Sequence, residues 1–129
     1  MNEITRTMAA AASGMAAQAA RLRLSSENIA NADTPGYRRK LVSFEETMGG
    51  GDARAVATGP VRLDETQLSR IHDPNHPLAG PDGYYDSSNV NMMVEIADAR
   101  EANRSYEANL RMFEQARQMA GSLIDLLRR

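Results

Sequence analysis

Two histidines and an aspartate lie close together in the sequence, and they are residue types that bind divalent metal ions. His72, Asp73 and His76 share one short segment, and zinc sites use imidazole and carboxylate ligands. However, Pro74 and Pro77 interrupt this segment, and the chain has no cysteine. Because a zinc site needs three or four ligands held in fixed orientation, we interpret the cluster as solvated surface. We expect no metal and no cofactor.

A second group of residues is basic. It comprises Arg21, Arg23, Arg38, Arg39 and Lys40, with Tyr37 as a possible stacking group. Basic residues beside an aromatic ring are typical of nucleic-acid interfaces, but the formal net charge of the chain is -2. A net acidic chain has no general attraction for nucleic acid. We therefore favour a solvated face or contacts with an acidic protein partner, and we expect no nucleic acid.

The remaining candidates for chemistry are weaker. Gly49–Gly51 lack the downstream Lys and Ser/Thr of a phosphate-binding loop, so with Asp52 they are interpreted as a mobile link. Glu45 and Glu46 are adjacent on a predicted strand, where successive side chains point to opposite faces. No residues resemble a catalytic constellation, and an enzyme is the class that we expect least.

An apolar stripe runs along residues 91–127. Its members alternate steps of four and three residues, the spacing of a helix that packs lengthwise against other helices. They are Met92, Ile96, Ala99, Tyr106, Leu110, Phe113, Ala120, Ile124 and Leu127, with Asn103 and Arg117 completing the pattern. No proline interrupts the segment, and Asn91 or Ser88 can cap it. At about 1.5 Å per residue the helix would be about 54 Å long.

The first thirty residues repeat this pattern. The same spacing joins Ile4, Met8, Ala11, Met15, Gln18, Leu22, Ser25 and Ile29 in an alanine-rich, helix-favouring background. The helix should end before Pro35 and Gly36, a pair that suits the central positions of a type II turn. Both ends of the chain are therefore predicted to be helices with an apolar edge.

Between the helices, short extended segments are predicted. Leu41–Phe44 is expected to form a strand that ends near Glu46, and 55–58 and 61–63 are expected to form weak strands. Gly59 and Pro60 between them suggest a hairpin corner. We expect an irregular path with one strand over 73–91, because prolines and glycines interrupt it.

The chain has too few large side chains for a large compact core. Six of its 129 residues are aromatic and none is tryptophan, so we predict a rod-like molecule. The two helices could simply form each other's core, but Met93, Met112, Met119 and Leu123 lie off the main stripes. More than one face of the helices would then be covered. We predict that the lone protein has loose ends, which become ordered when copies or relatives pack around them.

Neither membrane insertion nor secretory cleavage is expected. No stretch approaches the roughly twenty apolar residues of a membrane-spanning helix. The alanine-rich start is broken by Ser13, Gly14 and Gln18 and lacks a basic leading region, unlike a secretory signal.

Two segments resemble a known family, the bacterial flagellar axial proteins. Ser26–Lys40, with the sequence SENIANADTPGYRRK, resembles their N-terminal signature, and Arg104–Leu126 resembles the paired C-terminal signature. The matched motif residues are Asn28, Asn31, Pro35, Gly36 and Tyr37 in the first segment and Tyr106, Glu107, Ala108 and Asn109 in the second.

Within this family, the short chain resembles the proximal rod proteins. The run Asp73–Asn91 is similar to rod proteins of the FlgC type, which commonly read Asn-Pro-Leu-Ala, Gly-Tyr-Val and Pro-Asn-Val-Asn there. Tyr85 stands here in place of valine and Ser88 in place of proline. The turn 33–37 does not by itself separate the C type from the B type.

The resemblance implies a structural subunit of the rod, the periplasmic shaft that transmits motor torque to the hook. It also implies export by the flagellar type III apparatus without signal cleavage. The implied partners are copies of the chain, other rod proteins, and adaptor proteins at the MS ring or rod base. A cytosolic helical adaptor or export chaperone is the alternative class, and fractionation with basal bodies would separate the two.

The fold expected is mainly α, with the terminal helices forming an antiparallel coiled coil of the inner tube and a small β-containing irregular insert. The expected parts are 1–36, 37–90 and 91–129. The residues predicted to pack in assembly are Ile4, Met8, Met15, Leu22, Ile29, Ile96, Tyr106, Leu110, Phe113, Ile124 and Leu127.

Overall fold

The computed structural model describes residues 2–48 and 54–128. Two helices account for most of them, α1 (Glu3–Ala30) and α2 (Met92–Leu127). Both predicted helices are therefore confirmed. The mobile link predicted at 49–52 lies outside the described residues.

Each helix begins at an asparagine whose side chain accepts backbone hydrogen bonds. The Asn2 side chain accepts from the Thr5 N–H at 2.8 Å, and the Asn91 side chain accepts from Met93 and Val94. Such caps satisfy amide groups that have no partner within the helix. Of the two caps considered for α2, Asn91 is the one that the structure uses.

A tight turn ends α1 and redirects the chain. The Tyr37 N–H donates to the Thr34 carbonyl at 3.2 Å, and Gly36 has a φ of 74°. A positive φ at the third position is what a type II turn requires, and glycine adopts it without steric cost. The turn predicted at Pro35 and Gly36 is therefore confirmed.

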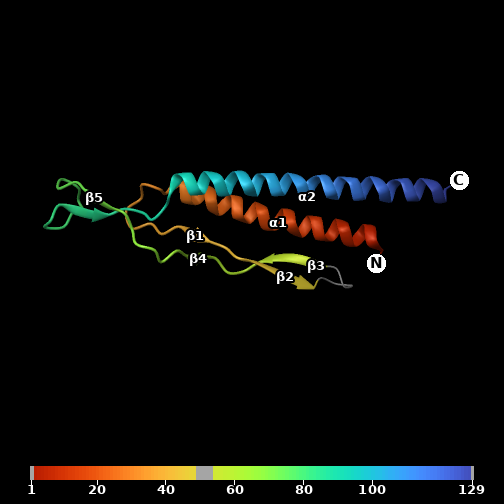
Figure 1. The fold of residues 1–129 in the computed structure, drawn as a ribbon, viewed down its shortest axis with the longest axis horizontal. Coiled ribbons are helices and arrows are strands. Elements are labelled where there is room, and N and C mark those ends of the chain that lie inside the picture. Colours follow the sequence, from red (N-terminus) through yellow and green to blue (C-terminus); the bar gives the residue numbers. More distant parts are fainter. Residues whose placement is uncertain (1, 49–53, 129) are drawn as a thin grey trace.

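The two helices lie side by side and run in opposite directions, so both termini lie at the same end of an elongated molecule (Figure 1). Arg21 of α1 pairs with Asp98 of α2 at 3.3 Å, near one end. Nearer the termini, Gly14 lies directly against Asn109. Because α2 has 36 residues and α1 has 28, the C-terminal turns of α2 extend past the start of α1 (Figure 1).

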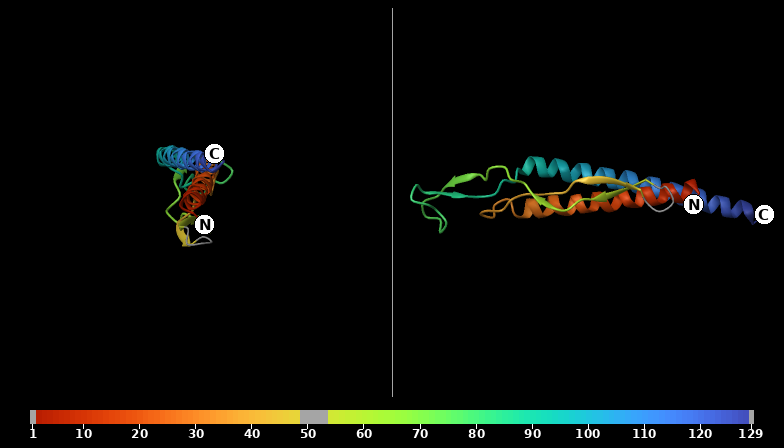
Figure 2. Two further views of the ribbon diagram at one scale, coloured as in Figure 1. Left: turned by 90° about the vertical axis from the view of Figure 1, so that its right-hand side faces the viewer. Right: turned by 90° about the horizontal axis from the view of Figure 1, so that it is seen from below.

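A long antiparallel ribbon covers α1 on the side away from α2 (Figures 1 and 2). It consists of β1 (Lys40–Leu41) paired with β4 (Arg62–Leu63), and β2 (Phe44–Met48) paired with β3 (Arg54–Thr58). β3 packs on α1, where the Val56 N–H donates to the Ser13 hydroxyl at 3.0 Å. α1 is thus the middle layer of three.

The ribbon corrects two strand predictions. The strand expected at Leu41–Phe44 is split, because 42 and 43 lie between β1 and β2. The hairpin corner expected at Gly59 and Pro60 is wrong, since β3 and β4 pair with β2 and β1 instead of with each other. Three residues (59–61) face two (42–43) between the paired segments, so the extra residue is accommodated as a bulge.

A second hairpin projects past the helices at the end opposite the termini (Figures 1 and 2). It pairs β5 (Arg70–His72) with β6 (Tyr84–Asp86), and we call residues 70–86 the arm. The single strand expected in this region is present as β6, and the pattern did not predict its partner β5.

The centre of the helix pair is made of small side chains. The buried apolar residues are Ala11, Ala17, Leu24, Ala102 and Ala116. On α2 the line of closest approach follows Glu95, Ala102, Asn109 and Ala116, which are seven residues apart. This line lies one position from the predicted stripe, because small residues let the helix backbones approach and larger ones are displaced to the rim. No described helix is apolar enough to cross a membrane.

Candidate functional site

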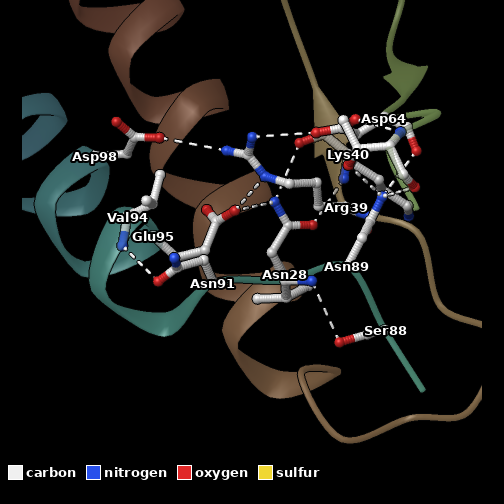
Figure 3. Close-up of polar contacts among 12 residues, drawn as sticks. Asn28, Arg39, Lys40, Asp64, Ser88, Asn89, Asn91, Val94, Glu95 and Asp98 are labelled. Atoms are coloured by element: carbon white, nitrogen blue, oxygen red, sulfur yellow. Dashed lines mark hydrogen bonds and ion pairs between the residues drawn. The ribbon is translucent and has the colours of Figure 1, made fainter. Parts of the chain in front are cut away.

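Two regions could serve a function, one at each end of the helix pair. A polar cluster joins both helices to the insert near the start of α2, and we call it the polar clamp (Figure 3). It comprises Asn28, Arg39, Asp64, Asn89, Glu95 and Asp98. At the other end, the last turns of α2 expose apolar side chains.

Asn28 is the centre of the polar clamp and is only 1% exposed. Its side-chain oxygen accepts hydrogen bonds from the Tyr37 hydroxyl and the Lys40 N–H, both at 2.8 Å. Its amide nitrogen donates to the Lys40 carbonyl at 3.1 Å and to the Glu95 carboxylate at 3.2 Å. One side chain of α1 therefore fixes both the chain after the turn and the first turn of α2.

Arg39 and Glu95 form the ion pair of the clamp (Figure 3). The Arg39 Nε lies 2.7 Å from Glu95 Oε1, and the Glu95 side chain is 1% exposed. The guanidinium also reaches Asp64 at 3.4 Å and Asp98 at 3.5 Å. Burial alone would lower the pKa of Arg39, but hydrogen bonds and charges of Glu95 and Asp64 outweigh it and raise that pKa.

The insert contributes Asp64 and Asn89. The Asn89 side chain accepts from the Arg39 N–H at 2.7 Å and donates to the Asp64 carbonyl at 2.9 Å. The pKa of the Asp64 carboxyl is lowered, chiefly because the Thr66 N–H donates to it at 2.9 Å, and Arg39 adds to the effect. Burial raises the pKa of the Tyr37 hydroxyl, with Lys40 opposing this shift.

Most of the predicted basic group is engaged within the chain. Lys40 pairs with Glu27 at 3.0 Å, and Arg21 pairs with Asp98 and Glu101. Arg38 donates to the carbonyls of Asp64 and Thr66. These contacts join the elements of one chain and engage four of the five basic residues, while Arg23 is exposed.

The last turns of α2 form an apolar surface of a different kind. We call it the tail surface, and it consists of Met119, Leu123, Ile124, Leu126 and Leu127, all of which are exposed. Leu126 is 62% exposed and Leu127 is 86% exposed. Contiguous exposed apolar side chains mark interaction sites on soluble proteins.

The structure leaves the predicted packing residues partly accessible. Ile4, Met8, Met15, Leu22 and Ile29 of α1 are half-buried, as are Tyr106, Leu110 and Phe113 of α2. Ile96, Ile124 and Leu127 are exposed. They thus follow the rims of the helix contact instead of its centre.

The matched motif residues have separate positions. Asn28 and Tyr37 belong to the polar clamp or touch it, Asn31 donates to the Glu27 carbonyl, and Pro35 and Gly36 form the turn. The second motif lies on α2, where Asn109 faces Gly14, Tyr106 is half-buried, and Glu107 and Ala108 are exposed.

The histidines lie in the arm. His76 stacks on Tyr85 with ring centres 3.9 Å apart, and His72 meets Tyr84 edge-on at 4.7 Å. His76 Nδ1 accepts from the Leu78 N–H. Among residues 2–48 and 54–128, no group of three possible ligands could hold a metal ion.

The sequence analysis missed the polar clamp. Asp64 and Glu95 lie far apart in the sequence, and no spacing rule brings them together. Glu95 stands in the first turn of α2, where the helix dipole favours any carboxylate, so its position in the sequence does not indicate a buried partner.

Comparison with known proteins identifies the family. The family described as "Flagella basal body rod protein" matches residues 8–38, and the one described as "Flagellar basal body rod FlgEFG protein C-terminal" matches residues 82–126. The first match covers most of α1 and the turn, and the second covers most of α2. These are the segments that carry the motifs.

Curated relatives agree along the length of the chain. Flagellar basal-body rod protein FlgC of Agrobacterium fabrum is 40% identical over 136 residues, which cover 99% of this chain and 98% of the relative. FlgC of Salmonella typhimurium is 32% identical over 84% of this chain and 87% of its own length. FlgC of Bacillus subtilis is 31% identical over 77% and 81%. The chain belongs to the FlgC family and is a structural subunit of the flagellar basal-body rod.

Proposed function

We propose that this subunit builds the proximal rod with α1 and α2 as an antiparallel coiled coil of the inner tube and residues 37–90 on the outside. The tail surface carries this proposal. Its apolar side chains are 48% to 86% exposed in a single chain, and neighbouring subunits would bury them. Rod membership supports the same conclusion, because a rod needs contacts that repeat along its length.

The contacts proposed are heterologous, meaning that different faces of successive subunits meet. Such contacts build an open helical assembly instead of a closed ring. Copies of this chain, other rod proteins and adaptors at the rod base are the partners proposed, and the type III apparatus would deliver the chain. The polar clamp would hold the insert at a fixed angle to the helices, so that torque turns the subunit as one body.

Burial of the tail surface would contribute part of the free energy of assembly. Full burial of a leucine, isoleucine or methionine side chain gains about 1.5 to 3 kcal/mol. Each of the five side chains has roughly half of that gain left, so one covered tail surface contributes about 5 kcal/mol. The contact would add this amount at each subunit interface, and further contacts between subunits would supply the rest.

The test is an acidic substitution on this surface. Leu126→Asp should fold normally, because Leu126 is already largely in water, but it should abolish swimming and remove the chain from detergent- and salt-resistant basal bodies. Leu63→Asp on β4 is the matched control, since Leu63 is 56% exposed but lies on the ribbon. Leu110→Asp, on the predicted stripe, should also abolish assembly.

The readouts are swimming in soft agar, basal-body fractionation and the circular dichroism of the purified chains. Wild-type swimming and incorporation of Leu126→Asp would contradict the proposal. So would equal loss of incorporation for Leu126→Asp and Leu63→Asp.

A further inference from the structure

The arm projects past the helices and is held at its base (Figures 1 and 2). Within the described chain, the hydrogen bonds and ion pairs of residues 70–86 join residues of the arm to one another, as in the pairing of Arg70 with Asp82 and Asp86. The angle between the arm and the helix pair is therefore set by the residues that flank the arm.

The turn that follows α1 has one acceptor and one donor that are not used within the turn. A backbone carbonyl in a turn commonly accepts from the residue three positions on. For Ala32 that residue is Pro35, which has no N–H. The Gly36 N–H, four positions on, donates instead to the Ser87 carbonyl at 3.1 Å. The Ala32 carbonyl is therefore left for a donor from another part of the chain.

Ser88, at the base of the arm, supplies this donor. Its hydroxyl donates to the Ala32 carbonyl and accepts from the Val90 N–H at 3.3 Å. Ser87 is 4% exposed and Ser88 is 2% exposed, so water does not readily replace these bonds if they break. A hydroxyl can donate and accept at once, which an alanine side chain cannot do. We call the contact of residues 32–36 with residues 87–88 the joint.

The joint is tied to both strands of the arm. The Ser87 N–H donates to the Ser69 carbonyl at 2.7 Å, and the Ser69 N–H donates to the Ser88 carbonyl at 3.1 Å. These bonds extend the pairing of β5 with β6 as far as the joint. A tilt of the arm relative to α1 would therefore break hydrogen bonds between buried groups.

We propose that Ser88 is a positioning residue that fixes the angle of the arm, so that the arm and the two helices turn as one rigid body. The polar clamp is proposed to hold the ribbon side of the insert, and the joint extends this to the projecting end. The expected effect on swimming rests on the proposed rod function, because a hinged arm would bend under torque instead of transmitting it. The fixed angle itself does not depend on that function.

Spin labels measure this angle in the purified chain, which has no cysteine of its own. Labels on Asn75→Cys in the arm and on Arg100→Cys in α2, both at exposed positions, give a distance distribution by pulsed electron paramagnetic resonance. We expect one narrow distribution for the labelled chain without further change. Adding Ser88→Ala should broaden it, because the link from the arm to Ala32 is lost.

Ser26→Ala is the matched control. The Ser26 hydroxyl also donates to a backbone carbonyl, that of Leu22 at 2.9 Å, but this bond lies within α1. The control should leave the distribution narrow. Hydrogen exchange at the Gly36 amide should be slow in the wild-type chain and in Ser26→Ala but fast in Ser88→Ala, with the same helical circular dichroism in all three. In cells, Ser88→Ala should enter basal bodies but swim less well than Ser26→Ala.

A broad distribution for the labelled chain without further change would overturn the proposal, and so would fast exchange at Gly36 in the wild-type chain. Equal distributions for Ser88→Ala and Ser26→Ala would also overturn it. If Ser88→Ala does not fold, the distribution and the Gly36 exchange of the chain with Ser88 intact decide.

The link with torque is tested separately from the angle. Normal swimming of Ser88→Ala with a broadened distribution would overturn this link. Absence of the wild-type chain from basal bodies would instead contradict the proposed function and leave the fixed angle untouched, so the two failures are distinguishable.

Discussion

Replacing Arg39 by methionine should destabilise the chain more than any comparable change to an ion pair at its surface. The substitution keeps most of the side-chain volume but removes the charge that pairs with Glu95 at 2.7 Å. Glu95 is 1% exposed, so its carboxylate would remain buried with Asn28 as its one remaining donor among the described residues.

The magnitude follows from this burial. Removing one partner of a buried ion pair costs about 3 to 5 kcal/mol, because the other charge is left uncompensated. We expect the lower end, about 3 kcal/mol, since the Arg39 side chain is itself 18% exposed and water can partly replace it. Arg70→Met is the matched control, because Arg70 pairs with Asp82 at a similar 2.8 Å but both side chains are about half exposed. Its effect on stability should be small.

Urea denaturation of the two purified variants, followed by circular dichroism, measures the difference. Arg39→Met should lower the midpoint strongly and Arg70→Met should barely change it. Adding Glu95→Met to Arg39→Met should restore part of the loss, because the buried charge is then gone. Equal midpoints for Arg39→Met and Arg70→Met would refute the reasoning, and so would a double variant less stable than Arg39→Met alone.

Three further predictions concern acid, glycines and the tail. The pKa of the Asp64 carboxyl is lowered in the folded chain. The ionised carboxylate therefore stabilises the fold above the ordinary pKa of 3.8, and this stabilisation is lost as the pH falls below that value. Asp64→Asn should flatten the decline of the urea midpoint between pH 7 and pH 3. Gly121→Ala should raise the melting temperature, since alanine favours a helix by about 1 kcal/mol and nothing lies within 4 Å. Gly14→Ala should lack this gain, because its Cβ would lie 2.7 Å from the Asn109 oxygen. Hydrogen exchange at 120–127 should be fast in the isolated chain and slow in basal bodies, and full protection in the isolated chain would contradict the prediction of loose ends.

The helices were predictable because their signals are local. A continuous 3.6-residue pattern without proline, an asparagine cap and a Pro-Gly turn each depend on neighbours within a few positions. The structure places the helix ends at Ala30 and Met92, as the pattern indicated. The type II turn at Gly36 was predictable for the same reason.

The ribbon was predicted less well because pairing is not a local property. Gly59 and Pro60 have the residue types of a turn, yet the chain continues through them as a bulge beside Ser43, whose carbonyl accepts from the Gly59 N–H at 2.8 Å. Short strands with mixed patterns specify their register weakly. Contact with α1 through Ser13 and Val56 helps to hold the pairing in place.

The residues at the centre of the helix pair lie one position along the sequence from the apolar stripe that was predicted. Periodicity identifies where large apolar residues lie, but close helix contacts favour small ones. Ala102 and Ala116 therefore face α1, and the larger Leu110 and Phe113 lie at the rim. The contact within the chain therefore leaves the larger residues of the stripe partly exposed at its rim.

The two ends of the helix pair differ in how far their side chains are satisfied within one chain. Buried polar groups destabilise a chain unless each is paired, and the polar clamp pairs Asn28, Arg39 and Asp64 within one molecule. It can therefore define the angle between helices and insert in a lone chain. Apolar side chains impose no such geometry, and Leu126 and Leu127 remain uncovered. In the proposed assembly these side chains would be buried between subunits, so the free energy of their burial would help to hold the subunits together.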